Sequence, residues 1–209
     1  MMSEALLENR DYTVILAKSP SENIQSEPLP LDRWQTASAS IVALASKCSE
    51  FDPDGITVYI TADSIKNYRQ VKEEQLALLV QEFQETAPPE IFNLVKVLQT
   101  VLDDYFARKE AGQTKENGEI IIVVTDEEPP ERQELVKAIV NATHKINNNE
   151  ELGIGFAQIG EHSITKGFFS ALDDDLNVAG ARFDIVDTKV LDTTETSSLI
   201  QFLFDIIND

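Results

Sequence analysis

The sequence predicts a doubly wound α/β domain, and two observations carry that prediction. Short apolar runs alternate with segments of helical period along nearly all of the 209 residues. The apolar runs are almost uninterrupted, which is typical of parallel strands that are covered by helices on both faces. This alternation favours a mainly parallel central sheet with right-handed helical crossovers. We therefore expect a single domain over residues 1–209, in which residues 1–10 form a flexible N-terminal segment.

Five apolar runs are predicted to be the main strands. They are Tyr12–Ala17, Ile56–Ala62, Glu119–Thr125, Leu152–Ile159 and Arg182–Asp187. The fifth run alternates more between apolar and polar residues, which favours a place near an edge of the sheet. Ser64–Arg69 is a candidate for an additional short edge strand. Gly153 and Gly155 lie inside the fourth run, where glycine is typical of close packing between a helix and a strand.

Apolar residues at three- and four-residue spacing predict helices between these runs. The stripes run from Trp34 to Phe51, from Leu76 to Phe83, from Leu94 to Phe106, from Leu135 to Ile146, from Ile164 through Phe168 and Leu172 to Leu176, and from Leu199 to Ile206. Cys48, the only cysteine, lies on the first stripe, so we expect it to be a buried small hydrophobic residue.

Charge and composition limit the possible functions. The formal net charge is -20, from 37 acidic and 17 basic residues, and such a field repels nucleic-acid phosphate and anionic lipid. The segment MMSEALLENR has neither the basic start nor the apolar core of a signal peptide, and no apolar stretch is long enough to span a membrane. We expect a cytoplasmic protein that binds neither nucleic acid nor membranes.

The loops that follow the strands are where ligands bind in open α/β sheets. Ser19 and Ser21 follow the first run and Asp126 follows the third, so these side chains are predicted to lie close together. The first loop has no glycine for a dinucleotide, and the chain contains no G-x-x-x-x-G-K-[ST] and no G-x-S-x-G motif. His162 is interpreted as a solvated loop residue, and His144 as a residue near the C-terminal dipole of a helix. We therefore expect no enzymatic activity.

Four stretches of this chain resemble the von Willebrand factor A domains, and most closely their stand-alone bacterial kind. They are "DYTVILAKSPSEN", "RWQTASASIVALASKCSEFDPDGITVYI", "IIIVVTDEEPPERQELVKAIVNAT" and "ELGIGFAQIGEHSITKGFFSALDDDL". Together with "ARFDIVDT" they cover nearly the whole chain in the order of the family. The resemblance implies a mainly parallel sheet between helices, with a metal-ion-dependent adhesion site at the carboxyl ends of the strands, here called the top face. It also implies a role in protein–protein recognition.

In the family, that site has a D-x-S-x-S pattern after the first strand, a threonine on a second loop and an aspartate after a later strand. The first aspartate aligns with Ala17 and is therefore missing, whereas the two serines align with Ser19 and Ser21. Phe92 replaces the threonine, and Asp126 matches the late aspartate. The resemblance thus implies a degenerate site of which Ser19, Ser21 and Asp126 are the vestiges.

A hard cation such as Mg²⁺ prefers oxygen ligands in near-octahedral geometry. Ala17 has no side-chain oxygen, and Phe92 places a ring where a hydroxyl group is needed. We therefore expect no bound metal and no other cofactor. The alternative is weak binding of Mg²⁺ or Mn²⁺, with Glu127 or Glu128 supplying a missing oxygen.

Two residues near the site leave alternatives open. Lys18 either points outward into solvent, or its ammonium group stands in for the missing cation and pairs with Asp126. Phe92 either lies exposed at a loop tip, where an aromatic side chain can anchor an interface, or closes the core.

We expect a non-enzymatic protein–protein interaction module that contacts another protein through its top face. The residues expected at that contact are Lys18, Ser19, Pro20, Ser21, Phe92, Asp126 and Glu127. The acidic composition favours a basic partner. The alternative is a subunit of a bacterial regulatory, stress-response or ATPase-associated complex that retains weak divalent-cation binding. The sequence indicates no particular oligomeric state.

Overall fold

The computed structural model describes residues 4–20, 30–62, 64–191 and 195–208. Within these residues, six strands form one sheet in the order β3-β2-β1-β4-β5-β6, in which all neighbours are parallel except β3, which is antiparallel to β2. The strands are β1 (Asp11–Ala17), β2 (Ile56–Thr61), β3 (Ile65–Val71), β4 (Glu119–Thr125), β5 (Leu152–Gln158) and β6 (Val186–Val190). The predicted doubly wound α/β fold is confirmed.

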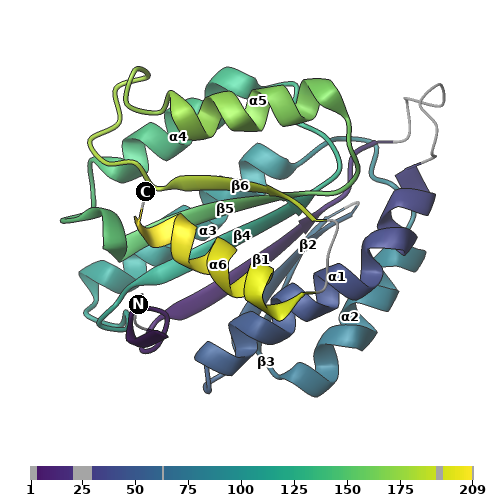
Figure 1. The fold of residues 1–209 in the computed structure, drawn as a ribbon, viewed down its shortest axis with the longest axis horizontal. Helices are drawn as coiled ribbons and strands as arrows, with labels where there is room; N and C mark the ends of the chain where they lie inside the picture. Colours follow the sequence, from purple (N-terminus) through teal and green to yellow (C-terminus); the bar gives the residue numbers. More distant parts are fainter. Residues whose placement is uncertain (1–3, 21–29, 63, 192–194, 209) are drawn as a thin grey trace.

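Helices cover both faces of the sheet (Figure 1). They are α1 (Pro30–Phe51), α2 (Glu73–Glu85), α3 (Leu94–Glu110), α4 (Arg132–Thr143), α5 (Ser163–Asp174) and α6 (Thr196–Asn208), with short 3-10 helices at Glu4–Leu6 and Asn149–Glu151. Side chains of α1, α2 and α6 form one buried cluster with the sheet. Side chains of α3, α4 and α5 form the second cluster on the opposite face. Each strand in the centre is therefore buried on both sides, which explains its uninterrupted apolar sequence.

The two central strands, β1 and β4, mark the point where the strand order reverses. The chain leaves β1 through α1 toward β2 on one side, and it returns through α3 to β4 on the other side. Ala17, the last residue of β1, pairs in register with Thr61 on β2 and with Thr125 on β4. The loops that follow β1 and β4 therefore begin side by side, at the position where open α/β sheets bind ligands.

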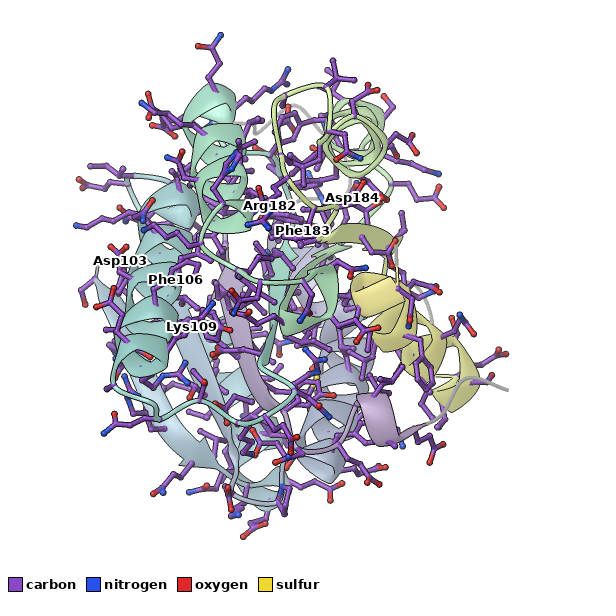
Figure 2. All side chains as sticks on the ribbon, turned by 90° about the vertical axis from the view of Figure 1, so that its left-hand side faces the viewer. Asp103, Phe106, Lys109, Arg182, Phe183 and Asp184 are labelled. Atoms are coloured by element: carbon purple, nitrogen blue, oxygen red, sulfur yellow. The ribbon has the colours of Figure 1, made fainter. Side chains whose placement is uncertain are left out.

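The fifth predicted strand, Arg182–Asp187, is wrong in its bounds, because β6 comprises Val186–Val190. Arg182 and Phe183 are held by other contacts before the ladder begins: the Arg182 amide donates to Thr143 Oγ1 at 3.0 Å, and the Arg182 guanidinium lies 4.9 Å from the centre of the Phe183 ring. Figure 2 shows Arg182 and Phe183 on the loop that leads into β6. The predicted edge position of this strand is confirmed, and so is the candidate edge strand, seen as β3.

The predicted core stripe of α5 is displaced by one residue at its start. Ile164 is 58% exposed, whereas Thr165, Phe169 and Leu172 are buried. Phe169 stacks on Phe156 of β5 with ring centres 4.7 Å apart, and this contact sets the face that the helix turns inward. Apolar spacing alone did not resolve which of two adjacent phenylalanines faces the sheet.

Residues 4–10 pack against the domain, so the expected flexible N-terminal segment is wrong for that part of the chain. Leu7 is fully buried in the core, and its carbonyl oxygen accepts a hydrogen bond of 2.8 Å from the Tyr12 hydroxyl. The Asn117 side chain donates to the carbonyl oxygen of Glu8 at 2.7 Å. Residues 1–3 lie outside the described part of the chain.

The two glycines of β5 allow α6 to approach the sheet closely, as predicted. A Cβ atom built on Gly153 would lie 2.4 Å from Ile206 Cγ2, and one built on Gly155 would lie 2.4 Å from Ile206 Cδ1. Cys48 is fully buried on α1, which confirms its interpretation as a small core residue. Across the described ranges, we find no helix whose length and hydropathy would carry it through a bilayer.

Candidate functional site: the top face

The top face begins where β1 and β4 end. Lys18, Ser19 and Pro20 follow β1, and Asp126 and Glu127 follow β4. Because these two strands are paired through their last residues, the two loops start next to each other. Ser21, the second predicted vestige of the adhesion site, lies outside the described residues.

Ser19 binds the Asp126 carboxylate through two donors, as the sequence predicted when it placed these residues together. The Ser19 amide donates to Oδ1 at 2.9 Å, and the Ser19 hydroxyl donates to Oδ2 at 2.8 Å. Both residues are fully buried. Burial raises the pKa of Asp126 above its usual value, and the hydrogen bonds from Ser19 oppose that rise.

Ala17 and Phe92, the two apolar substitutions in the adhesion-site pattern, belong to the same buried cluster. Phe92 is only 7% exposed, so of the two alternatives the ring closes the core and does not lie at an exposed loop tip. Ala17 is fully buried. Apolar packing therefore fills the positions that would carry an aspartate and a threonine in the family pattern.

Lys18 is buried, so the expectation that it points outward into solvent is wrong. Its ammonium group donates to the carbonyl oxygens of Phe83 at 2.9 Å, Thr86 at 2.8 Å and Gln84 at 3.3 Å. It also lies 4.7 Å from the centre of the Phe83 ring. Lysine is favourable at this place because the last carbonyl groups of a helix lack partners and carry negative partial charge.

The other alternative for Lys18 was a direct pair with Asp126. The hydrogen bonds of the ammonium group go to the end of α2 instead. Burial lowers the pKa of Lys18, and the charge of Asp126 acts in the opposite direction. Asp126 thus influences Lys18 through space, while α2 provides its binding partners.

Glu127 and Glu128 were the candidates to supply a missing oxygen ligand. Glu128 accepts hydrogen bonds from Arg132 and Thr165, so its carboxylate is held between α4 and α5. Burial opposes ionisation of Glu128, but the bonds from Thr165 and Arg132 outweigh it and hold its pKa below the usual value. The Glu127 carbonyl oxygen accepts a bond of 2.9 Å from the Thr125 hydroxyl, which shapes the start of the loop.

The two histidines lie at helix ends. His162 lies in the loop before α5, as interpreted, but it is half-buried, with Nδ1 3.1 Å from Thr165 Oγ1. His144 follows the last residue of α4, as predicted, and its Nε2 lies 3.0 Å from the Gly180 carbonyl oxygen. Neither contact joins the Ser19–Asp126 pair.

Among the described residues, the top face offers few oxygen ligands for a divalent cation. The Asp126 carboxylate already accepts two hydrogen bonds from Ser19, and Ala17 and Phe92 offer no oxygen atom. In the described part of the chain, no group of three or more histidine, cysteine, aspartate or glutamate side chains is arranged to hold a metal ion. A hard cation prefers about six oxygen ligands, and the described residues of the top face bring together fewer than that.

Four of the residues expected at the partner contact are too buried to offer much surface to a partner. They are Lys18, Ser19, Phe92 and Asp126. These four therefore offer less surface than a direct partner contact needs, while Pro20 and Glu127 are half-buried. Sequence reasoning missed Ile91, which precedes Phe92 and is 68% exposed. The pair Ile91-Phe92 is apolar in the sequence, and in the bend before α3 only Phe92 enters the core.

Ile91 stands where three surface depressions meet. The helical groove, of about 550 Å³, runs between α3 and α4, and the edge hollow, of about 490 Å³, lies next to β3. The proline hollow, of about 500 Å³, lies over the loop after β4. Its lining residues are Pro20, Glu90, Ile91, Phe92, Glu127, Glu128, Pro129, Pro130, Glu131 and Arg132.

The fold defines an α/β domain with a mainly parallel central sheet, in which the loops after the two central strands begin side by side. No known protein-family profile matches the sequence, and no curated protein sequence matches it. Solved structures do match in fold. Manganese-loaded TRAP protein from Plasmodium vivax has a TM-score of 0.58 at 13% identity, over 93% of this chain and 74% of that one.

Two proteins of bacterial pili are also similar in fold. The pilus adhesin SpaC from Lactobacillus rhamnosus GG has a TM-score of 0.54 at 9% identity, over 95% of this chain and 30% of that one. The PilB minor pilin from Streptococcus sanguinis has a TM-score of 0.51 at 11% identity, over 95% of this chain and 60% of that one. This chain thus spans less than two thirds of either pilus protein, and at these identities the likeness shows the fold alone.

Proposed function

We propose that this protein is a non-enzymatic protein–protein interaction module that binds its partner at the top face without a bridging cation. The observation that carries this proposal is the Ser19–Asp126 pair, which uses both oxygens of the carboxylate inside the protein. The fold similarity to an adhesin supports the general role in binding. Ile91 is an exposed apolar residue that lines three depressions, and it supports the top face as the location of the partner contact.

An enzymatic role receives no support from the same residues. The Ser19 hydroxyl is buried and donates its hydrogen bond to a carboxylate, so it is not presented to a substrate. Nucleophilic catalysis needs a base within reach and an open space for the reacting atom. The closed geometry around Ser19 favours a structural role.

Calorimetric titration tests the metal-independent part of the proposal. We expect no binding heat when Mg²⁺, Mn²⁺ or Ca²⁺ is added to the parent protein. The matched variant carries Ala17→Asp and Phe92→Thr, which restores two oxygen ligands of the family pattern, and its fold is checked by circular dichroism. Tight, stoichiometric cation binding by the parent protein would overturn the proposal.

Site-specific photo-crosslinking tests the place of the contact. A photoreactive amino acid at position 91 should capture a protein partner in cells, and an excess of chelator added to the lysate before irradiation should leave the yield unchanged. Position 78 on α2 is the matched control, because Leu78 has the same 68% exposure as Ile91 but lies away from the top face. Equal capture at the two positions, or loss of capture with chelator, would contradict the proposal.

A further inference from the structure

The three depressions around Ile91 share lining residues and form one continuous surface. Ile91 lines all of them, Glu131 is shared by the helical groove and the proline hollow, and Lys96 is shared by the helical groove and the edge hollow. Ile91 therefore projects from the middle of the surface. An apolar side chain at the centre of an interface is the kind of position that carries a large share of binding energy.

Charge is distributed unevenly over this surface. Four glutamates and one arginine line the proline hollow, and that arginine, Arg132, is paired with Glu128. Glu90 and Glu131 are exposed beside Ile91. Lysines line the other two depressions: Lys96 lines both the helical groove and the edge hollow, and Lys137 lines the helical groove. The acidic potential is thus concentrated over the loop after β4.

The floor of the proline hollow is also stiff. Pro129 is buried and Pro130 is exposed at the point where the chain turns into α4. Proline fixes one backbone dihedral, so this segment has little conformational freedom to lose when a partner binds. A preformed apolar floor with an acidic rim is suited to a side chain that is long, partly apolar and positively charged at its end.

We infer that the partner binds this surface with a segment in which an arginine or lysine lies next to a large apolar residue. This inference rests on the proposed function and specifies its chemistry. The apolar side chain packs on Ile91 and Pro130, and the basic side chain reaches Glu90 and Glu131. The net charge of -20 adds long-range attraction for such a segment and repels an acidic one.

Short random peptides displayed on phage can test the inference. The library is selected on the full chain at low salt and counter-selected on the empty support. The expected result is a set of peptides that carry arginine or lysine beside an aliphatic or aromatic residue. Peptides enriched in acidic or uncharged residues, or a selection that yields no binder, would overturn the inference.

Fluorescence anisotropy of the selected peptides then separates the contribution of the apolar contact to the binding affinity from that of the acidic side chains. We expect Ile91→Ser to weaken binding about tenfold, because it removes the central apolar contact. The Glu90→Gln, Glu131→Gln double variant should weaken it about threefold to tenfold and should flatten its salt dependence. The matched controls are Leu78→Ser and the Glu82→Gln, Glu110→Gln double variant, which removes the same charge from exposed sites elsewhere.

The outcomes distinguish the inference from the proposed function. Peptides that require Ile91 but bind the two double variants equally would overturn the charge inference and leave a top-face module intact. Binding that is unaffected by Ile91→Ser would place the contact elsewhere and contradict both.

Discussion

The amide and hydroxyl groups of Ser19 bind the two different carboxylate oxygens of Asp126, at 2.9 and 2.8 Å. One residue thereby joins the loop after β1 to the loop after β4, at the centre of the top face. The pair is fully buried, so its protonation and its hydrogen bonds both contribute to the stability of the fold.

Asp126→Asn should change how stability depends on pH. Burial raises the pKa of Asp126 in the folded protein above its unfolded value, so in the window between the two values the folded state binds more protons. The free energy of unfolding contributed by this group therefore rises as the pH falls through the raised pKa. Urea denaturation at a series of pH values should show the parent protein gaining stability relative to Asp126→Asn toward acid pH. Parallel curves for the two proteins would contradict this.

Ser19→Ala should destabilise the protein by about 1–3 kcal/mol, because it leaves a buried carboxylate oxygen without its hydroxyl donor. The same change should raise the pKa of Asp126 further, since the hydroxyl bond favours the ionised form. Chemical denaturation measures the first effect, and its pH dependence measures the second. Ser64→Ala, at an exposed position, is the control and should change the free energy of unfolding little. Equal stabilities of the two variants would show that the hydroxyl bond does not contribute.

Lys18→Met should destabilise the protein by about 1–3 kcal/mol, because three carbonyl oxygens near the end of α2 lose a charged donor. Methionine keeps the unbranched apolar stem, so the variant tests the ammonium group and not the packing. Amide hydrogen exchange should show faster opening of the last turn of α2. Lys66→Met on β3, where the side chain is exposed, is the control. Unchanged exchange in α2 would contradict the proposed anchoring role.

Two glycine substitutions should change stability in opposite directions. Gly153→Ala places a methyl group 2.4 Å from Ile206 Cγ2 and 2.9 Å from the Ile206 carbonyl oxygen, so α6 must shift, at a cost of about 1–3 kcal/mol. Gly167→Ala meets no atom within 4 Å inside α5 and should stabilise the protein by about 0.5–1 kcal/mol through helix propensity. Thermal unfolding measures both. A stable Gly153→Ala variant would show that α6 can adapt without cost.

The sequence was sufficient for the fold where its signals agreed. The run Glu119–Thr125 is a strand with those bounds, because every residue in it is buried between two helix layers. The bounds of β6 were not predictable, because Phe183 continues the apolar pattern although the first hydrogen bond to β5 is accepted two residues later, by the Ile185 carbonyl oxygen. Apolar periodicity reports burial, and it does not report which backbone groups are paired.

The sequence predicted which residues of the site lie together, but it did not predict which of them are exposed. Strand ends brought Ser19 and Asp126 together as expected, since the register of a parallel sheet follows from its topology. The burial of Lys18 could not be predicted, because its partners are backbone carbonyl groups at the end of α2. Every residue has such a group, so the sequence does not indicate which of them a lysine will bind. Phe92 is a core residue while Ile91 is exposed, and this difference depends on the bend before α3, which the sequence does not specify.

The packing of α6 on β5 also affects how this domain can respond when a partner binds. Ile206 lies against both glycine positions, and Phe202, one turn earlier in the helix, lies against Gly155. Sliding the helix along its axis by a turn would replace the side chains that now pack over Gly153 and Gly155 with different ones, and the close contacts of Ile206 and Phe202 would be lost. We expect α6 to keep a single position, so that an event at the top face is not relayed along this helix to the opposite end of the sheet.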